Sequence, residues 1–268
     1  MRLYARQNGV ETSADMIMPL PLTEEQISNL TNENYTTEIN NMDAIRLYQN
    51  LGLPDGSNIT VIPIIPGITR MAYIRFLNAN PMIGPVDIYV NGRKVVSGLK
   101  YQAFTEYMKV FQGYYRIAVF KAGTTENPIS VTRLNVIRNR IYTVAITGDA
   151  ESVGSEVIVD GRRTLNPDLS YMRFIHLSDN APSVDVYVDD RLVLSDLGFN
   201  EVSRYLSLLP GEHSIVFKKA NTDDVILIDP VATLKAGKAY SVYFVGEEGM
   251  DPGLQVLIPL EGTTYLKF

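Results

Sequence analysis

The chain has 268 residues, 24 basic and 30 acidic side chains, and a formal net charge of −6. This acidic balance gives no electrostatic basis for binding nucleic acid or anionic lipid, and no apolar run approaches the roughly 18 residues of a membrane-spanning helix. Cysteine is absent, which excludes disulfides, thiolate metal sites and a cysteine nucleophile. We therefore expect no nucleic-acid partner and no membrane insertion.

An N-terminal arm, residues 1–70, differs in composition from the rest of the chain. It has four arginines and eight acidic residues but no lysine. The sequence that starts at Thr23 is a capping box, which predicts a short helix near 23–30, and a second short helix is expected to end at Gly52. No apolar stretch of roughly 7–15 residues follows the charged start of the chain, so no secretory signal is expected.

The arm ends in an extended apolar segment, 58–66, which contains Val61, Ile62, Ile64 and Ile65. Its two prolines remove backbone donors and favour β or polyproline geometry in the residues before them. Two interpretations are open. The segment is an edge strand or linker packed on its own chain, or it is an arm that adds a strand to the sheet of a neighbouring molecule. In the second case these four residues make the assembly contact.

The rest of the chain is an internal repeat in which Tyr73 and the residues after it recur from Tyr171 onward. The matched positions include Arg75 and Arg173, Tyr107 and Tyr205, Lys121 and Lys219, Tyr142 and Tyr240, and Gly148 and Gly246. A constant offset over such a length indicates duplication, and each copy has the size of a sandwich domain. We therefore divide the chain into an arm (1–70), a first repeat (71–160) and a second repeat (161–268).

Each repeat has the pattern of a series of short β-strands. Polar and apolar residues alternate in Val86–Val90, which is typical of a half-buried strand. Asn91–Gly92 then predicts a two-residue hairpin turn, and Asp189–Asp190 predicts a less ideal turn in the second repeat. Short strands without helical periodicity between them predict an all-β fold of two tandem antiparallel β-sandwiches. We expect an immunoglobulin-like architecture, and transthyretin-like connectivity is the open alternative.

One set of recurring residues carries a family resemblance. The second repeat contains Arg173–His176, Val184–Val188 and Pro210–Gly211, whereas the first has Asn78 at the histidine position and Gln112 before its glycine. This pattern resembles the bacterial domain of unknown function 4397. The resemblance implies a tandem sandwich of surface or secreted proteins, and, because the family has no established activity, it implies no catalytic residues.

Histidine is scarce, with only His176 and His213. Acid–base and nucleophilic catalysis usually need an imidazole beside a partner, yet the first repeat has Asn78 and Tyr115 at the equivalent positions. No metalloprotease, hydrolase or phosphate-loop motif occurs. Several aspartates between residues 179 and 190 carry oxygen ligands, but their spacing fits no recognised calcium loop. We expect no enzyme activity, no cofactor and no metal.

Two aspartates recur on the same predicted strand, and each precedes a tyrosine by two residues. They are Asp87 with Tyr89 and Asp185 with Tyr187. One interpretation is that these four residues and His176 form a ligand-binding face. The alternative is that each aspartate anchors a loop through backbone amides or pairs with the recurring strand arginine.

The sixteen tyrosines suggest a second function, because exposed rings can bind sugars, although recurring strand tyrosines are also typical of a core. The function that we expect is a non-enzymatic structural or interaction protein of a bacterial cell or spore surface. It would self-associate through the arm or bind other surface proteins. The alternative is a carbohydrate-binding or adhesive module that binds glycans.

Overall fold

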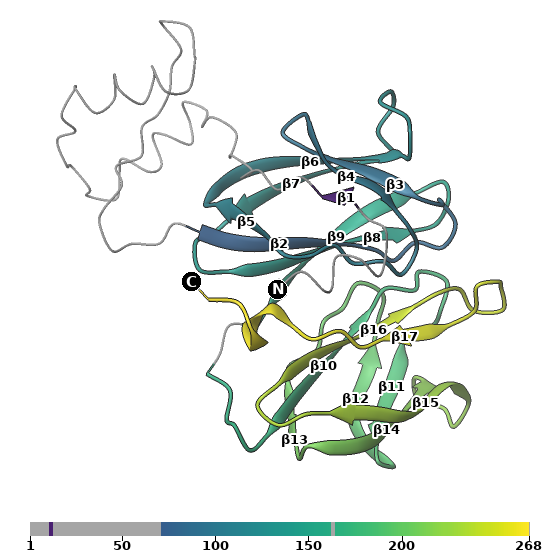
Figure 1. Ribbon diagram of the computed structural model, residues 1–268. Helices are drawn as coiled ribbons and strands as arrows, with labels where there is room; N and C mark the ends of the chain where they lie inside the picture. The colour runs from purple at the N-terminus through teal and green to yellow at the C-terminus, as the bar shows by residue number, and fades with distance from the viewer. Residues whose placement is uncertain (1–10, 13–70, 162–163, 268) are drawn as a thin grey trace, which may run out of the picture.

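The computed structural model describes residues 11–12, 71–161 and 164–267 (Figure 1). The helices predicted for the arm, and its apolar segment 58–66, lie outside these residues. The predicted all-β fold of two tandem sandwiches is confirmed, and Figure 1 shows one sandwich above the other.

The first sandwich is built from two sheets with the strand orders β1-β4-β3-β6-β7 and β5-β2-β8-β9. Its strands are β1 (Glu11–Thr12), β2 (Met71–Asn78), β3 (Val86–Val90), β4 (Arg93–Leu99), β5 (Met108–Phe111), β6 (Gly113–Lys121), β7 (Ser130–Val136), β8 (Ile141–Gly148) and β9 (Val153–Asp160). The short strand β1 pairs with the outer edge of β4, with Glu11 opposite Ser97 and Thr12 opposite Val96.

The second sandwich repeats this plan with the orders β12-β11-β14-β15 and β13-β10-β16-β17. Its strands are β10 (Ser170–His176), β11 (Val184–Val188), β12 (Arg191–Leu197), β13 (Leu206–Leu208), β14 (Gly211–Lys219), β15 (Val225–Leu234), β16 (Ala239–Val245) and β17 (Gln255–Leu257). A strand equivalent to β1 is not present on β12 in the described residues.

The order of the strands distinguishes the immunoglobulin-like fold from the transthyretin-like alternative. Lettered A to H from β2, the strands of each repeat lie in the orders C-B-E-F and D-A-G-H, whereas an immunoglobulin constant domain has A-B-E-D and C-F-G. The order is that of the transthyretin-like alternative. The expectation of purely antiparallel sheets is wrong for one pair of strands in each repeat. Strand β2 pairs with β8, and β10 with β16, in parallel.

Local sequence explains the strands and their turns. Val86, Ile88 and Val90 point inward and are 0%, 0% and 3% exposed, as the alternation predicts. The hairpin between β3 and β4 turns through Asn91 and Gly92 with positive φ, and its equivalent turns through two aspartates with φ of 48° and 62°. Aspartate tolerates this region less well than glycine, so the second turn is the less ideal one, as expected.

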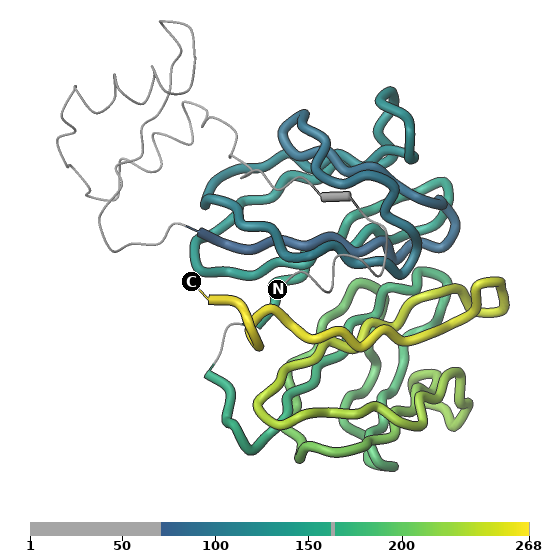
Figure 2. The backbone as a smooth tube through the Cα atoms, viewed as in Figure 1, coloured from purple at the N-terminus to yellow at the C-terminus, as the bar shows by residue number. Residues whose placement is uncertain are grey.

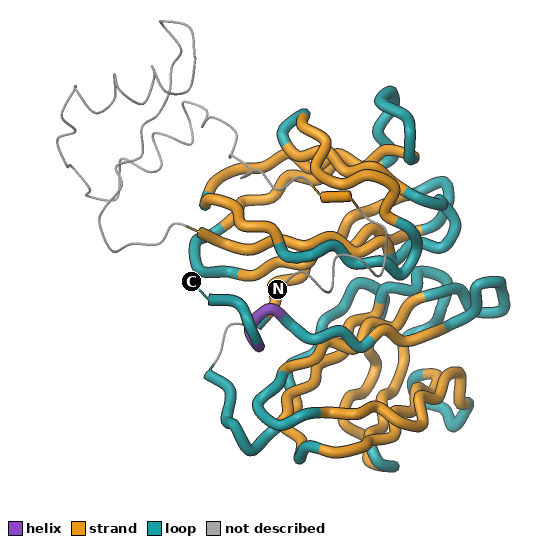
Figure 3. Tube along the Cα trace, viewed as in Figure 1, coloured by secondary structure: helices purple, strands orange, loops and turns teal. Residues whose placement is uncertain are grey.

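The two sandwiches pack through the sheets that contain β2 and β10. Leu77, Ala145 and Ile158 of the first sandwich form one buried cluster with Ile175 and Tyr243 of the second. The sheets that contain β3 and β11 therefore lie at the two ends of a four-layer stack, as the tube in Figure 2 shows. In the described part of the chain the single helical element is the 3-10 turn η1 (Gly262–Thr264; Figure 3), and no helix is long and apolar enough to span a bilayer.

Candidate functional site

The largest buried polar site among the described residues lies between the two sandwiches. Its ionised members are Arg75, Asp160, Arg173 and Glu261, and none is more than 4% exposed. The two arginines occupy equivalent positions on β2 and β10 and point to the outer faces of their sheets. On a single sandwich such residues would face solvent. They are buried here because these two faces pack against each other.

Arg173 binds both carboxylates. Its Nε donates to Glu261 Oε1 at 2.7 Å and to the Ser241 hydroxyl at 2.9 Å, and its Nη2 donates to Asp160 Oδ1 at 2.6 Å. Its Nη1 donates to the Val159 carbonyl at 2.9 Å. Val159 and Asp160 lie on β9 of the first sandwich, so a single guanidinium group joins the two sandwiches.

Arg75 has a different environment. None of the ion pairs within the described residues includes it. Its Nε donates to the Thr143 hydroxyl at 2.9 Å and its Nη2 to the Tyr243 hydroxyl at 3.2 Å. Its guanidinium carbon lies 4.7 Å and 4.6 Å from the ring centroids of Phe104 and Tyr107. This arginine is therefore held by hydroxyls and aromatic faces.

A tyrosine–carboxylate pair recurs in each half of the network. The Tyr107 hydroxyl donates to Asp160 Oδ2 at 2.6 Å, and the Tyr205 hydroxyl donates to Glu261 Oε2. Thr143 and Ser241 likewise each donate to the carboxylate of their own half. Every carboxylate oxygen of the network accepts at least one hydrogen bond, as buried charges require.

Three positions break the symmetry of the network, since neither carboxylate recurs: Ile258 is equivalent to Asp160, and Arg163 to Glu261. Tyr243 on β16 reaches Arg75, but the equivalent residue in the first repeat is Ala145, which has no group that can reach Arg173. Arg173 instead binds Asp160 from the other sandwich. The duplication has thus diverged so that the two copies complete each other.

The charges of the network balance, with two guanidinium groups and two carboxylates. Burial alone would lower the pKa of each arginine, but neighbouring groups, chiefly Tyr243 for Arg75 and Glu261 for Arg173, outweigh it and raise the pKa. Burial also raises the pKa of the two tyrosines that donate to the carboxylates. The two arginines and these two tyrosines therefore keep their protons near neutral pH.

Asp87, predicted for a ligand face, anchors a bulge of β4 and the loop between β6 and β7 in the first sandwich. It is 1% exposed and accepts from the Gly98 and Gly123 amides at 2.8 and 3.1 Å and from Lys94 Nζ at 2.6 Å. Burial raises its pKa, but these donors outweigh burial and lower it. The loop-anchoring interpretation describes this residue. The suggested pairing with Arg75 is wrong, because that arginine lies at the sandwich interface.

Asp185 anchors the equivalent backbone amides in the second sandwich. It is 8% exposed, and its carboxylate accepts from the Asp196 and Asn221 amides at 2.8 and 3.1 Å. These two donors stand at the positions equivalent to Gly98 and Gly123. Neither aspartate presents a free carboxylate to a ligand.

Tyr89 and Tyr187 are half-buried on the outer faces of the two end sheets. A lysine ammonium lies over each ring, Lys94 at 5.4 Å from the Tyr89 centroid and Lys218 at 4.7 Å from the Tyr187 centroid. Because the end sheets lie at opposite ends of the stack, the structure does not bring these residues and the two aspartates together into one face.

His176 is a core residue. It is 0% exposed, its ring packs edge-on against Phe244 at a centroid distance of 4.9 Å, and burial lowers its pKa. Its Nε2 lies 3.1 Å from the Pro182 carbonyl, while Asn78 Nδ2 donates at 3.0 Å to Gly84, which is the position equivalent to Pro182. Histidine and asparagine therefore make the same hydrogen bond in the two repeats.

His213 forms a surface ion pair. Its Nδ1 lies 2.7 Å from Asp189 Oδ2 and its Nε2 lies 2.8 Å from the Leu209 carbonyl. Burial lowers its pKa, but these two acceptors outweigh burial and raise it. The pair ties the β11–β12 turn to the start of β14.

A second polar cluster lies at the seam between the sandwiches. Glu247 follows β16 and is 4% exposed, and burial, with Asp179 and Asp149 nearby, raises its pKa to about 7. Asp149 belongs to the first sandwich and is the residue equivalent to Glu247. Within the described residues no group of three or more His, Asp or Glu side chains is arranged to hold a metal ion.

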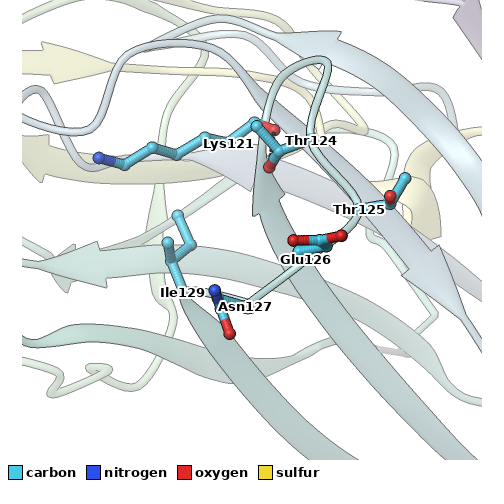
Figure 4. Close-up of a pocket in the computed structure, with 6 residues that line it drawn as sticks. All are labelled: Lys121, Thr124, Thr125, Glu126, Asn127 and Ile129. Atoms are coloured by element: carbon cyan, nitrogen blue, oxygen red, sulfur yellow. Dashed lines mark hydrogen bonds between the residues drawn. The ribbon is translucent and has the colours of Figure 1, made fainter.

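A shallow depression lies in the loop between β6 and β7 (Figure 4). Its volume is about 550 Å³, and it is lined by Lys121, Thr124, Thr125, Glu126, Asn127 and Ile129. None of the residues singled out in the sequence lines it. It offers one carboxylate and one ammonium group without an imidazole, which is no arrangement for acid–base catalysis.

The sequence contained a signal for the interface network that the ligand-face interpretation did not use. Arg75 and Arg173, and Tyr107 and Tyr205, recur at the repeat offset, and a charged residue that recurs on an apolar strand indicates a shared structural role. No local pattern distinguishes an outer face that meets solvent from one that meets a second domain.

The fold and this network define a tandem β-sandwich protein whose two copies share one buried polar interface. The family model described as "Domain of unknown function (DUF4397)" matches residues 72–187 and 170–263. The chain belongs to this family, as the sequence resemblance implied. No curated protein matches the chain.

Three solved structures show weak similarity. The C-terminal domain of AlgF from P. aeruginosa is 13% identical, with a TM-score of 0.25, over 34% of this chain and 100% of that one. The Bacillus anthracis TIE protein is 10% identical, with a TM-score of 0.23, over 66% of this chain and 34% of that one. A putative cell adhesion protein from Parabacteroides distasonis is 9% identical, with a TM-score of 0.20, over 72% and 99%. Similarity at this level gives no information on function.

Proposed function

We propose that this chain is a non-enzymatic structural or interaction protein of a bacterial cell or spore surface. The buried network supports this proposal, because Arg173 binds carboxylates of both sandwiches and so joins them into one stiff unit. The placement of the candidate catalytic groups agrees with it. His176 is enclosed in the core, and Asp87 and Asp185 already accept hydrogen bonds from loop amides.

In this proposal the protein assembles through its arm, with Val61, Ile62, Ile64 and Ile65 adding a strand to a neighbouring molecule. The observation that carries the proposal is the difference between two equivalent sheet edges. In the first sandwich, β1 from the N-terminal part of the chain already covers the edge of β4. In the second, β12 has no such neighbour among the described residues.

The exposure of the edge strands agrees with this difference. Val95 and Val96 on β4 are 2% and 0% exposed, whereas Val193 and Leu194 at the equivalent positions on β12 are half-buried. An uncovered edge with apolar side chains favours pairing with a further extended strand. A strand that pairs head to tail in this way builds an open filament when the contact does not close.

Engineered cysteines test this contact cleanly, because the chain has none of its own. An Ile62→Cys variant is mixed with a Ser195→Cys variant, and the expected result is a disulfide-linked heterodimer. Ser97→Cys, on the covered edge of β4, is the matched control and should capture far less. A chain that sediments as a monomer, with or without residues 1–67, overturns the assembly.

The alternative function, an adhesive or carbohydrate-binding module, is supported by a different surface. On the outer face of the second sandwich, Leu192, Tyr187, Val216 and Ile228 form one row across four strands, and Leu192 and Ile228 are 51% and 55% exposed. A glycan array with the native chain and with Tyr187→Ala tests it. Binding that Tyr187→Ala abolishes would favour this function, and an array without hits would exclude it.

A further inference from the structure

Two arginines lie directly opposite each other on the outer face of the first sandwich. Arg116 on β6 pairs in register with Arg133 on β7, in the end sheet that faces away from the second sandwich (Figure 1). Tyr115, Ile117 and Leu134, which are next to them in the sequence, belong to the core, so both arginines point outward, and both are exposed. The Cβ atoms of directly opposite residues lie about 4.5–5.5 Å apart, so the two guanidinium groups can reach the same bound group.

Neither of these arginines has an acidic partner. None of the ion pairs among the residues that the structure describes includes either of them. The neighbouring residues on the same face are neutral, with Tyr114 opposite Asn135 on one side and Ala118 opposite Val131 on the other. Like charges directly opposite each other destabilise a sheet, so a bound anion would offset a repulsion that the chain alone leaves in place.

The second sandwich lacks this arginine pair. Ser214 and Val231 occupy the equivalent positions, and Glu212 occupies the position of Tyr114. Strands β6 and β7 and the turn to β8 contain no acidic residue, whereas the equivalent residues of the second repeat include Glu212 and Asp229. The whole chain has a formal net charge of −6, so this face is a local concentration of positive charge on an acidic protein.

The groups beside the arginine pair suit a sugar. Tyr114, which is half-buried, and Asn135, which is exposed, lie between the pair and the turn after β7. This turn carries Arg138 and Arg140, and both are exposed. A tyrosine combines an apolar ring with a polar hydroxyl, and an asparagine amide can both donate to and accept from sugar hydroxyls. A charged clamp therefore lies next to neutral groups that can bind a ring with several hydroxyls.

We propose that this face of β6 and β7 binds an acidic glycan through a carboxylate or phosphate group. A guanidinium group presents a planar fork of N–H donors that matches either oxyanion, and Arg116 and Arg133 hold one such group between them. Tyr114 and Asn135 bind the sugar ring that carries it. Strand β7 lies at the opposite edge of the sheet from β1, so this site is independent of the strand contact proposed for the arm.

Titration calorimetry of the full chain at low ionic strength tests the site. Oligogalacturonate, which carries carboxylates, or phosphorylated dextran is expected to bind, whereas neutral dextran is not, and the affinity should fall as salt screens the exposed charges. Arg116→Ser and Arg133→Val, which install the residues of the second repeat, should each weaken binding roughly 10-fold or more. Arg204→Gln, which removes an exposed arginine of the second sandwich, is the matched control and should leave the affinity unchanged.

Urea unfolding without a ligand distinguishes a binding site from a structural role. Either substitution removes the repulsion within the pair, so the unfolding midpoint of Arg116→Ser and of Arg133→Val is expected to be unchanged or higher. A midpoint that falls in both variants overturns the proposal, as does a native chain that binds neither acidic glycan, or an affinity that both variants keep. Polyglutamate that binds as tightly as oligogalacturonate overturns the assignment of the ligand to a glycan.

Discussion

The interface network makes a sharp prediction because it contains two equivalent arginines with different partners. Arg173→Met leaves Asp160 and Glu261 buried without their cation, whereas Arg75→Met removes a group that is bonded to hydroxyls and a carbonyl. Breaking a buried ion pair by removing one partner costs about 3–5 kcal/mol, and losing the hydrogen bonds of a charged donor to neutral acceptors costs about 1.5–3 kcal/mol.

We therefore expect Arg173→Met to destabilise the protein by about 2 kcal/mol more than Arg75→Met, a difference of roughly 30-fold in the ratio of folded to unfolded chain. The measurement is urea unfolding followed by circular dichroism, with small-angle scattering to detect separation of the two sandwiches. The two variants change the same residue type at equivalent positions, so each serves as the control for the other.

A third variant tests the physical reason. Arg173→Met combined with Glu261→Gln removes one of the uncompensated charges, so it is expected to be less unstable than Arg173→Met alone. Two results would refute the charge-compensation argument. One is an equal loss of unfolding free energy in Arg75→Met and Arg173→Met. The other is a double variant whose loss equals the sum of the losses of Arg173→Met and Glu261→Gln.

Three further predictions concern single sites. Asp87→Ala leaves the Gly98 and Gly123 amides without an acceptor and is expected to cost about 2–3 kcal/mol in urea unfolding, whereas Asp87→Asn, which keeps an acceptor, should cost less. For Glu247, whose pKa of about 7 lies above its unfolded value, stability is full below about pH 4.5 and falls as the pH rises toward 7. Glu247→Gln should therefore become more stable than the native chain by about 1–3 kcal/mol above pH 7, and a difference that does not vary with pH would contradict this. His176→Asn, which installs the residue of the first repeat, should keep the bond to Pro182 and lower the unfolding midpoint only through lost ring packing against Phe244.

Local sequence predicted those features that depend on neighbouring residues. The alternation in Val86–Val90 gave the inward face of β3, and Asn91–Gly92 gave the hairpin, because both depend on backbone geometry over a few residues. The parallel pairing of β2 with β8 joins strands far apart in the chain, and no local pattern specifies it.

The site was harder to predict for a related reason. Arg75 has the outward position of a solvent-facing residue on a half-buried sheet, and only the second sandwich buries it. Asp87 was singled out because a carboxylate on an apolar strand is unusual, and the cause is local: two backbone amides and a lysine need an acceptor there. A recurring polar residue in a duplicated chain therefore indicates a shared structural requirement before it indicates a ligand.

The differences between the repeats indicate that the two sandwiches form one structural unit. Asp160 ends β9 of the first sandwich, yet its carboxylate binds Arg173 of the second. The fully buried Tyr243 of the second sandwich accepts a hydrogen bond from Arg75 of the first. Two identical copies could not make these exchanges, because Ala145 is equivalent to Tyr243 and Ile258 is equivalent to Asp160. Either sandwich alone would expose an apolar face and a charged group without its partner, so we expect each sandwich to be stable only as part of the pair.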